Sequence, residues 1–127
     1  MASQLLGDET ADTIVTICRT ALGDHLRSVT YFTRDDYEQL YLREGLSRDA
    51  DLMTFIGNEW YGFQVTEGSY SDSELGRYKY TIRVFDNGYL VRYTTEHDGV
   101  FLTSDGLTTR RFDEVYAALK ETLTERG

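Results

Sequence analysis

The sequence is poor in the residues that build metal sites, disulfides and rigid loops. Its 127 residues include one cysteine, Cys18, two histidines, His25 and His97, and no proline. A lone cysteine excludes an intramolecular disulfide and a cysteine-cluster metal site. Neither histidine has a second metal ligand three or four residues away, a spacing typical of metal sites. We therefore expect no metal centre, and no motif in the chain predicts a cofactor.

Catalytic and phosphate-binding motifs are also missing. The chain contains no Gly-x-Ser-x-Gly elbow for a serine nucleophile, and no Gly-Lys-Ser/Thr or Gly-x-Gly-x-x-Gly phosphate loop. The adjacent acids Asp35 and Asp36 are explained by turn chemistry. Cys18 lies on the apolar stripe of a predicted helix, which favours a buried side chain over a reactive thiol. We expect a protein that is not an enzyme.

Lysine is scarce, and acidic residues dominate the charge. Only Lys79 and Lys120 are lysines among the 13 basic residues, and 22 acidic residues give a net charge of −9. A surface of this sign repels the phosphates of nucleic acid, so we expect no nucleic-acid partner. High ionic strength screens the self-repulsion of such a surface. The composition therefore predicts a salt-rich cytoplasm, with an ordinary acidic protein as the alternative.

Long apolar segments are absent too. No apolar run approaches the ~20 residues that a membrane span requires, and the first residues lack the basic start and apolar stretch of a signal peptide. We expect a cytoplasmic protein with no membrane partner. With 40% hydrophobic and 28% charged residues, residues 1–127 predict a single globular α+β domain.

Hydrophobic periodicity predicts eight elements along the chain. Three are helices with apolar residues at three- and four-residue spacing, and five are strands. The helices are expected at 8–22, at 48–63 and from about 109, and the strands at 28–34, 37–44, 81–85, 90–94 and 100–104. The order α-β-β-α-β-β-β-α predicts an α+β fold, in which a five-stranded antiparallel sheet carries helices on both faces.

The clearest local signal is Asn87-Gly88 between two β-rich runs. Asn-Gly supplies the two positive φ angles of a type I′ hairpin turn, which predicts Arg83 directly opposite Arg92. Like charges in that position destabilise a hairpin, so the two arginines are expected to share a partner. The partner is an internal carboxylate such as Glu59, a second subunit or a bound anion, and exposure of the pair to solvent is a further alternative.

Two aromatic side chains of the predicted helix 48–63 lie away from the centre of its apolar stripe. Tyr61 projects opposite the stripe and Phe55 borders it, and aromatic residues outside the core are enriched at interfaces. An isolated exposed aromatic residue is the alternative. We predict an interface made by this helix and the hairpin, with the residues Phe55, Tyr61, Arg83, Phe85, Leu90 and Arg92.

The element order is similar to that of the Roadblock/dynein-light-chain and longin-like folds, in which a five-stranded sheet lies between a middle helix and two terminal helices. The segments YFTRDDYEQLYLR (31–43) and NGYLVR (87–92) also resemble a family of small haloarchaeal proteins with no assigned function. Roadblock-like proteins usually dimerise, and many are scaffolds or partners of small GTPases. The resemblance implies those roles here by analogy of fold.

Taken together, these features predict a non-enzymatic protein–protein interaction or regulatory module that forms a homodimer or binds another protein. The alternative is a ligand-sensing domain that binds a small anion on the face of Arg83 and Arg92. Thermal-shift screening with anionic metabolites separates the two, because a ligand that binds only the native state raises its stability.

Overall fold

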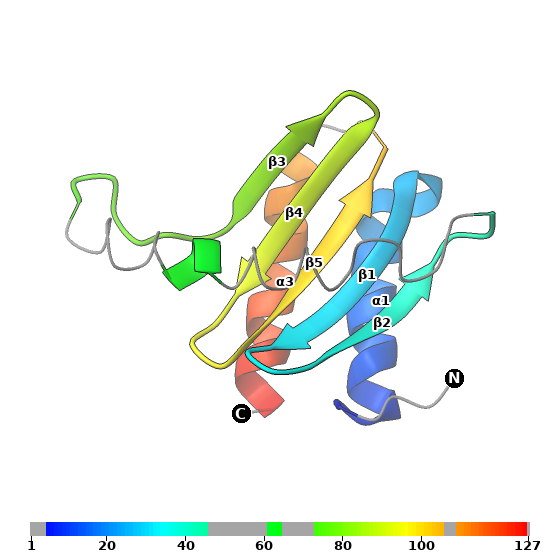
Figure 1. The fold of residues 1–127 in the computed structure, drawn as a ribbon, viewed down its shortest axis with the longest axis horizontal. Helices are drawn as coiled ribbons and strands as arrows, with labels where there is room; N and C mark the ends of the chain where they lie inside the picture. The colour runs from blue at the N-terminus through cyan, green and yellow to red at the C-terminus, as the bar shows by residue number, and fades with distance from the viewer. Residues whose placement is uncertain (1–4, 46–60, 65–72, 106–108, 127) are drawn as a thin grey trace.

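A five-stranded antiparallel sheet organises the chain (Figure 1). The computed structural model describes residues 5–45, 61–64, 73–105 and 109–126. The strands are β1 (Leu26–Thr33), β2 (Tyr37–Leu42), β3 (Thr81–Phe85), β4 (Gly88–Thr94) and β5 (Asp98–Ser104). They follow the order β2-β1-β5-β4-β3, so β2 and β3 are the edges. The predicted five-stranded antiparallel sheet is confirmed.

Two helices, α1 (Asp8–Leu22) and α3 (Thr109–Arg126), lie side by side on one face of the sheet (Figure 1). Both begin where the periodicity predicts, and α1 also ends there. Asp8 and Glu9 occupy the first turn of α1, where acidic side chains offset the positive end of the helix dipole. Gly23 follows the last residue of α1 with a φ of 56°, a conformation that favours glycine at a helix end. A short 3-10 helix, η1 (Gly23–His25), leads into β1.

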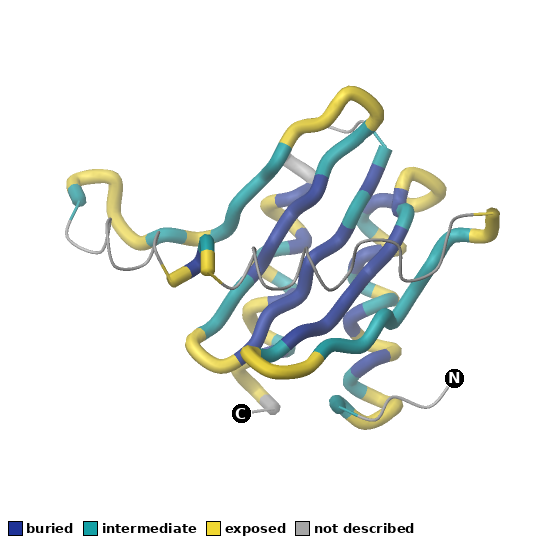
Figure 2. Tube along the Cα trace, in the orientation of Figure 1, coloured by how far each residue is buried: buried dark blue, intermediate teal, exposed yellow. Residues whose placement is uncertain are grey.

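The main core lies between this helix layer and the sheet. The strands β1, β4 and β5 are buried along most of their length (Figure 2). Alternate residues of a strand point to the same face, and those on the helix side contribute to the main core. Tyr93 is a polar member of this core, and its hydroxyl donates to the backbone oxygen of Phe112 at 2.9 Å. The buried members are Ile14, Cys18, Leu22, Leu26, Val29, Tyr31, Val91, Tyr93, Val100, Leu102, Phe112, Val115, Leu119 and Leu123.

The opposite face of the sheet carries a second, smaller core. Phe32, Leu90 and Phe101 form it, with Tyr37 packed against them. Residues 61–64 are helical and contact this face, so helices occur on both faces as expected. The rest of the predicted helix 48–63 lies outside the described residues. No helix in the described part of the chain is long and apolar enough to cross a membrane.

The pairing of β3 with β4 corrects the predicted hairpin register. Phe85 pairs with Gly88, Arg83 pairs with Leu90 and Thr81 pairs with Arg92, so the prediction of Arg83 opposite Arg92 is wrong.

The reason for the shift lies outside the hairpin. Gly88 belongs to the β4 ladder, where an added Cβ would lie 2.1 Å from the backbone oxygen of Ser104. The glycine therefore serves the close approach of β4 to the end of β5, and the loop is Asp86-Asn87. Because the register moves by two residues, Arg83 and Arg92 still share a face.

Asp105, directly after β5, links that end of the sheet to the neighbouring strand β1 and to the end of the edge strand β2. Its carboxylate accepts hydrogen bonds from Arg27 at 3.2 Å and from Arg43 at 2.8 Å. Arg43 also donates to the backbone oxygen of Asp24 at 2.9 Å. The hydrogen bond from Arg43, helped by that from Arg27, holds the pKa of Asp105 below its ordinary value.

This lowered pKa predicts a pH-dependent contribution to stability. A carboxylate with a depressed pKa in the folded state stabilises the protein above its unfolded pKa, and that stabilisation is lost as the pH falls through the folded pKa. Asp105→Asn should lower the free energy of unfolding at pH 7 by less than about 1 kcal/mol, because the ion pairs are partly exposed. The difference from the parent protein should shrink below about pH 4. Urea denaturation at pH 7 and pH 3 measures both values.

The matched control is Asp35→Asn, in the exposed turn between β1 and β2. It should change the free energy of unfolding by much less at pH 7. A deficit of Asp105→Asn that is as large at pH 3 as at pH 7 would contradict the ion-pair explanation.

Cys18 should be unreactive in the folded protein. Its side chain is fully buried, and burial raises the pKa of the thiol to about 12. Because the thiolate is the reactive form, a thiol reagent at pH 8 should label folded Cys18 roughly 1000-fold more slowly than the unfolded chain. Absorbance after addition of a disulfide reagent, with and without denaturant, measures the ratio. Rapid labelling of the folded protein would show that α1 opens readily.

Candidate interaction site

The exposed end of the edge strand β3 is the most prominent apolar surface among the described side chains. Among the residues that the structure describes, four large hydrophobic side chains are exposed, namely Tyr61, Leu75, Val84 and Phe85. Val84 and Phe85 are adjacent, with 73% and 57% of their surfaces exposed. Because successive residues of a strand point to opposite faces, they flank the edge on both sides. This end of β3 therefore presents apolar side chains together with the backbone groups of a strand edge.

Arg92 lies on β4 and is buried on the face of the sheet away from α1 and α3. Only 1% of it is exposed. Its Nη2 donates to the hydroxyl of Tyr78 and to Oγ1 of Thr81, each at 2.8 Å. Phe63 packs its ring against that of Tyr78, with centroids 6.2 Å apart. Arg92 thus ties β4 to the start of β3 and to the helical residues 61–64.

Gly62 allows this arrangement because it has no side chain. A Cβ at Gly62 would lie 2.8 Å from Nη1 of Arg92 and 3.3 Å from Nη2 of Arg83. The structure therefore brings the two guanidinium groups together against the backbone of residues 61–64. The sequence predicts that Arg83 and Arg92 share a face of the sheet, but it does not predict that residues 61–64 pack against them. Glu59, the suggested acidic partner, lies outside the described residues.

The six residues of the predicted interface fall into three groups. Tyr61 and Phe85 are exposed, and Arg83 is half-buried. Leu90 and Arg92 are buried, so each packs within the chain in this structure. Phe55 lies outside the described residues.

Sequence reasoning missed Val84, Gly62 and Tyr78. Strand alternation predicts that Val84 faces the helix layer like Ile82, which does pack against the main core. Only the sheet order shows that β3 is an edge, and there Val84 remains 73% exposed. No local pattern distinguishes Gly62 or Tyr78, because both owe their role to Arg92, which is distant in the sequence.

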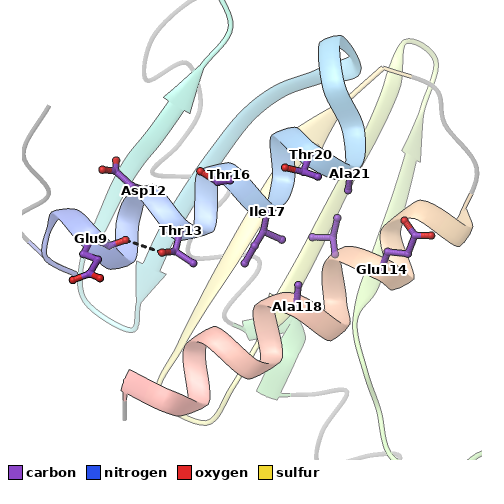
Figure 3. Close-up of a pocket in the computed structure, with 10 residues that line it drawn as sticks. Glu9, Asp12, Thr13, Thr16, Ile17, Thr20, Ala21, Glu114 and Ala118 are labelled. Carbon is purple, nitrogen blue, oxygen red and sulfur yellow. Dashed lines mark hydrogen bonds between the residues drawn. The ribbon is translucent and has the colours of Figure 1, made fainter.

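A separate groove of about 620 Å³ runs between α1 and α3 on the solvent side of the helix layer (Figure 3). Ile17 and Ala118 contribute apolar surface, while Glu9, Asp12 and Glu114 carry negative charge. Threonines of α1 also line it, and the hydroxyl of Thr13 donates to the backbone oxygen of Glu9 at 2.9 Å.

Both histidines are exposed, His25 in η1 and His97 in the turn between β4 and β5. Near that turn, Asp98 is buried and accepts hydrogen bonds from the hydroxyls of Tyr31 at 2.8 Å and Thr95 at 2.6 Å. Among the residues that the structure describes, no group of three or more His, Cys, Asp or Glu side chains is placed to hold a metal ion.

The different burial of the two arginines predicts different effects on stability. Arg92→Gln should lower the free energy of unfolding by at least about 2 kcal/mol, because it breaks charged hydrogen bonds in a buried cluster. Arg83→Gln, at a half-exposed position, should cost less than about 1 kcal/mol. Urea denaturation of both variants measures the difference. Equal losses would contradict the role of Arg92 as an internal anchor.

The fold is similar to solved structures of MglB. The gliding protein MglB of Thermus thermophilus has a TM-score of 0.68 at 14% identity, with 98% of each chain covered. The MglB of Myxococcus xanthus has a TM-score of 0.64 at 10% identity, with 95% of each chain covered. A further MglB structure, described as having a tetrameric arrangement, has a TM-score of 0.61 at 13% identity and covers 96% of this chain and 90% of that one.

Identities this low show the fold alone, and they confirm the Roadblock/longin-like layout expected from the element order. No curated protein matches the chain. Residues 12–124 match the family model of the domain of unknown function DUF7522. The chain therefore belongs to the DUF7522 family.

Proposed function

We propose that this protein is a non-enzymatic interaction module that forms a homodimer through the β3 edge of its sheet. The observation that carries the proposal is the pair Val84 and Phe85, which are adjacent and mostly exposed at the end of an edge strand. Edge strands of soluble proteins are usually protected by charge, proline or bulges. Two exposed apolar neighbours, flanked by Arg83 and Asp86, instead have the apolar centre and polar rim of an interface.

A second copy of the chain fits this surface by symmetry. An antiparallel pairing of β3 with itself relates the two copies by a two-fold axis, so each copy presents the same patch to the other. Arg83 contacts residues 61–64 through Gly62, and exposed Tyr61 is next to it in the chain. These residues extend the proposed surface onto the face of the sheet that carries Phe32 and Leu90. Phe55 remains a predicted member of the interface. Self-association of a similar fold in the tetrameric MglB arrangement supports the proposal.

The charge of the chain supports association in a salt-rich cytoplasm. Two copies with a net charge of −9 repel each other at low ionic strength. At molar salt the Debye length falls to about 3 Å, which removes most of that repulsion and leaves the apolar contact. The resemblance of segments 31–43 and 87–92 to small haloarchaeal proteins supports the same environment.

Two polar clusters among the described residues support a non-enzymatic role because they serve the fold. Asp105 joins Arg27 and Arg43 at one end of the sheet. At the other end, Asp98 accepts hydrogen bonds from Tyr31 and Thr95. The module would therefore act through the shape and charge of its surface, as a scaffold or regulatory partner.

The alternative, sensing of a small anion at Arg83 and Arg92, has weaker support. Arg92 is buried and donates to Tyr78 and Thr81 within the chain. A ligand would have to displace residues 61–64, which pack against both guanidinium groups through Gly62.

Replacement of the two exposed apolar residues tests the homodimer. Val84→Asp with Phe85→Asp should raise the dissociation constant of the dimer at least about 100-fold, because each side chain would lose roughly 1.5–3 kcal/mol of burial and bring like charges together. Light scattering after size exclusion, in molar salt and in dilute buffer, measures the mass of parent and variant. A folded, monomeric parent protein would refute the homodimer.

Leu75→Asp is the matched control, since it places the same charge at a residue that is 90% exposed and outside the β3 edge. It should leave the mass unchanged. If the β3 variant remains dimeric, the interface lies on another surface. Circular dichroism of each variant verifies that it is folded.

A further inference from the structure

The only two lysines of the chain meet at one tyrosine ring. Lys79 Nζ lies 5.8 Å and Lys120 Nζ lies 5.9 Å from the centroid of the Tyr116 ring. Lys120 is one helical turn after Tyr116 on α3, whereas Lys79 precedes β3. In a chain whose other basic residues are all arginine, the fold thus brings both lysines to one place.

These lysines line a hollow of about 690 Å³ between the start of β3, the turn after β4 and α3. Arg77 is a third basic residue there, and Glu96 is the one carboxylate among the described residues that line it. The local charge is therefore positive, although the chain carries a net charge of −9. The volume lies within the range of about 300–1,000 Å³ that is usual for small-molecule sites.

Tyr116 and Tyr78 line the hollow, and two further tyrosines that do not line it pack against Tyr116. Tyr116 lies 5.4 Å from Tyr80 and 6.3 Å from Tyr93 between ring centroids. Tyr93 is buried and hydrogen-bonded to the backbone of Phe112, so it fixes this cluster to the core. Tyr78 also lines the hollow, and its hydroxyl accepts a hydrogen bond from Arg92. A planar ring can stack on such a surface with little reordering of the protein.

Contacts within the protein leave these cations open to a ligand. Lys79 reaches Asp113 at 4.0 Å, the longest distance that counts as an ion pair, and the two side chains are 61% and 57% exposed. Pairs this exposed contribute little to stability. An incoming phosphate offers Lys79 and Lys120 a stronger, charge-assisted partner, and it offers Arg77 a bidentate one.

We propose that this hollow binds a small planar organic phosphate. Lys79, Lys120 and Arg77 would hold the phosphate, and the ring of the ligand would stack beside Tyr116 and Tyr78. The site does not include the exposed residues Val84 and Phe85 of the proposed dimer edge. Ligand binding can therefore be tested independently of the dimer.

The test is calorimetric titration of the full chain with phenyl phosphate, in the lowest salt that keeps the protein folded. Phenyl phosphate should bind at least about tenfold more tightly than inorganic phosphate or benzyl alcohol, because it alone uses both the cations and the rings. Benzoate, titrated in parallel, tests whether a carboxylate replaces the phosphate. Lys79→Gln with Lys120→Gln should weaken the binding of phenyl phosphate at least about tenfold, since two charged contacts are lost.

Arg19→Gln is the matched control. It removes one positive charge from a tyrosine ring outside the hollow, whereas the lysine variant removes two, since the guanidinium carbon of Arg19 lies 5.2 Å from the centroid of Tyr41. This variant should bind phenyl phosphate as the parent does.

Lys79→Arg with Lys120→Arg should retain most of the affinity, whereas Tyr116→Leu should remove the preference for phenyl phosphate over inorganic phosphate.

Three results would overturn the proposal. One is a parent protein that does not bind phenyl phosphate while thermal unfolding shows it to be folded. A second is a loss of binding free energy in Arg19→Gln that is half or more of the loss in the lysine variant, which would indicate general attraction of the anion to positive charge. Tighter binding of benzoate would overturn the choice of phosphate.

Discussion

The structure depends on a sheet that is buried on both of its faces. The central strands β1 and β5 are buried along nearly their whole length, whereas the edge strands β2 and β3 are half-buried or exposed. On one face, α1 and α3 cover Val29, Val91 and their neighbours. On the other, Phe32, Leu90 and Phe101 form the second core. The two surfaces proposed for function lie outside these faces, with Val84 and Phe85 at the β3 edge and the hollow of Lys79 and Lys120 at one end of the sheet.

Because both faces of the sheet are covered, the charged residue Arg92 has a structural role. A guanidinium group that is 1% exposed needs hydrogen-bond partners in the chain, and it has them in Tyr78 and Thr81. Its packing against Gly62 also joins residues 61–64 to β4. The sequence suggests a binding role for Arg83 and Arg92, but buried Arg92 mainly holds segments of the chain together. Exposed cations that lie close together occur instead at Lys79 and Lys120, outside the covered faces.

Much of the fold could be predicted because its signals are local. The 8–22 helix has apolar residues at helical spacing, acids in its first turn and Gly23 after its last residue, and the structure has the same limits. Cys18 is buried as its place on the stripe indicates. The alternation of β3 and β4 also predicts that Arg83 and Arg92 share a face. Each of these properties depends on residues within a few positions of one another.

The sequence by itself therefore determined the element order, the faces of the strands and the negative charge of the surface. Tertiary structure decided the register of the hairpin, because Gly88 is required by its approach to Ser104 and not by the turn. It also decided that Val84 is exposed at an edge and that Lys79 meets Lys120 at Tyr116. The physical reason is the same in each case, since these features arise from contacts between segments that are far apart in the chain and carry no local pattern.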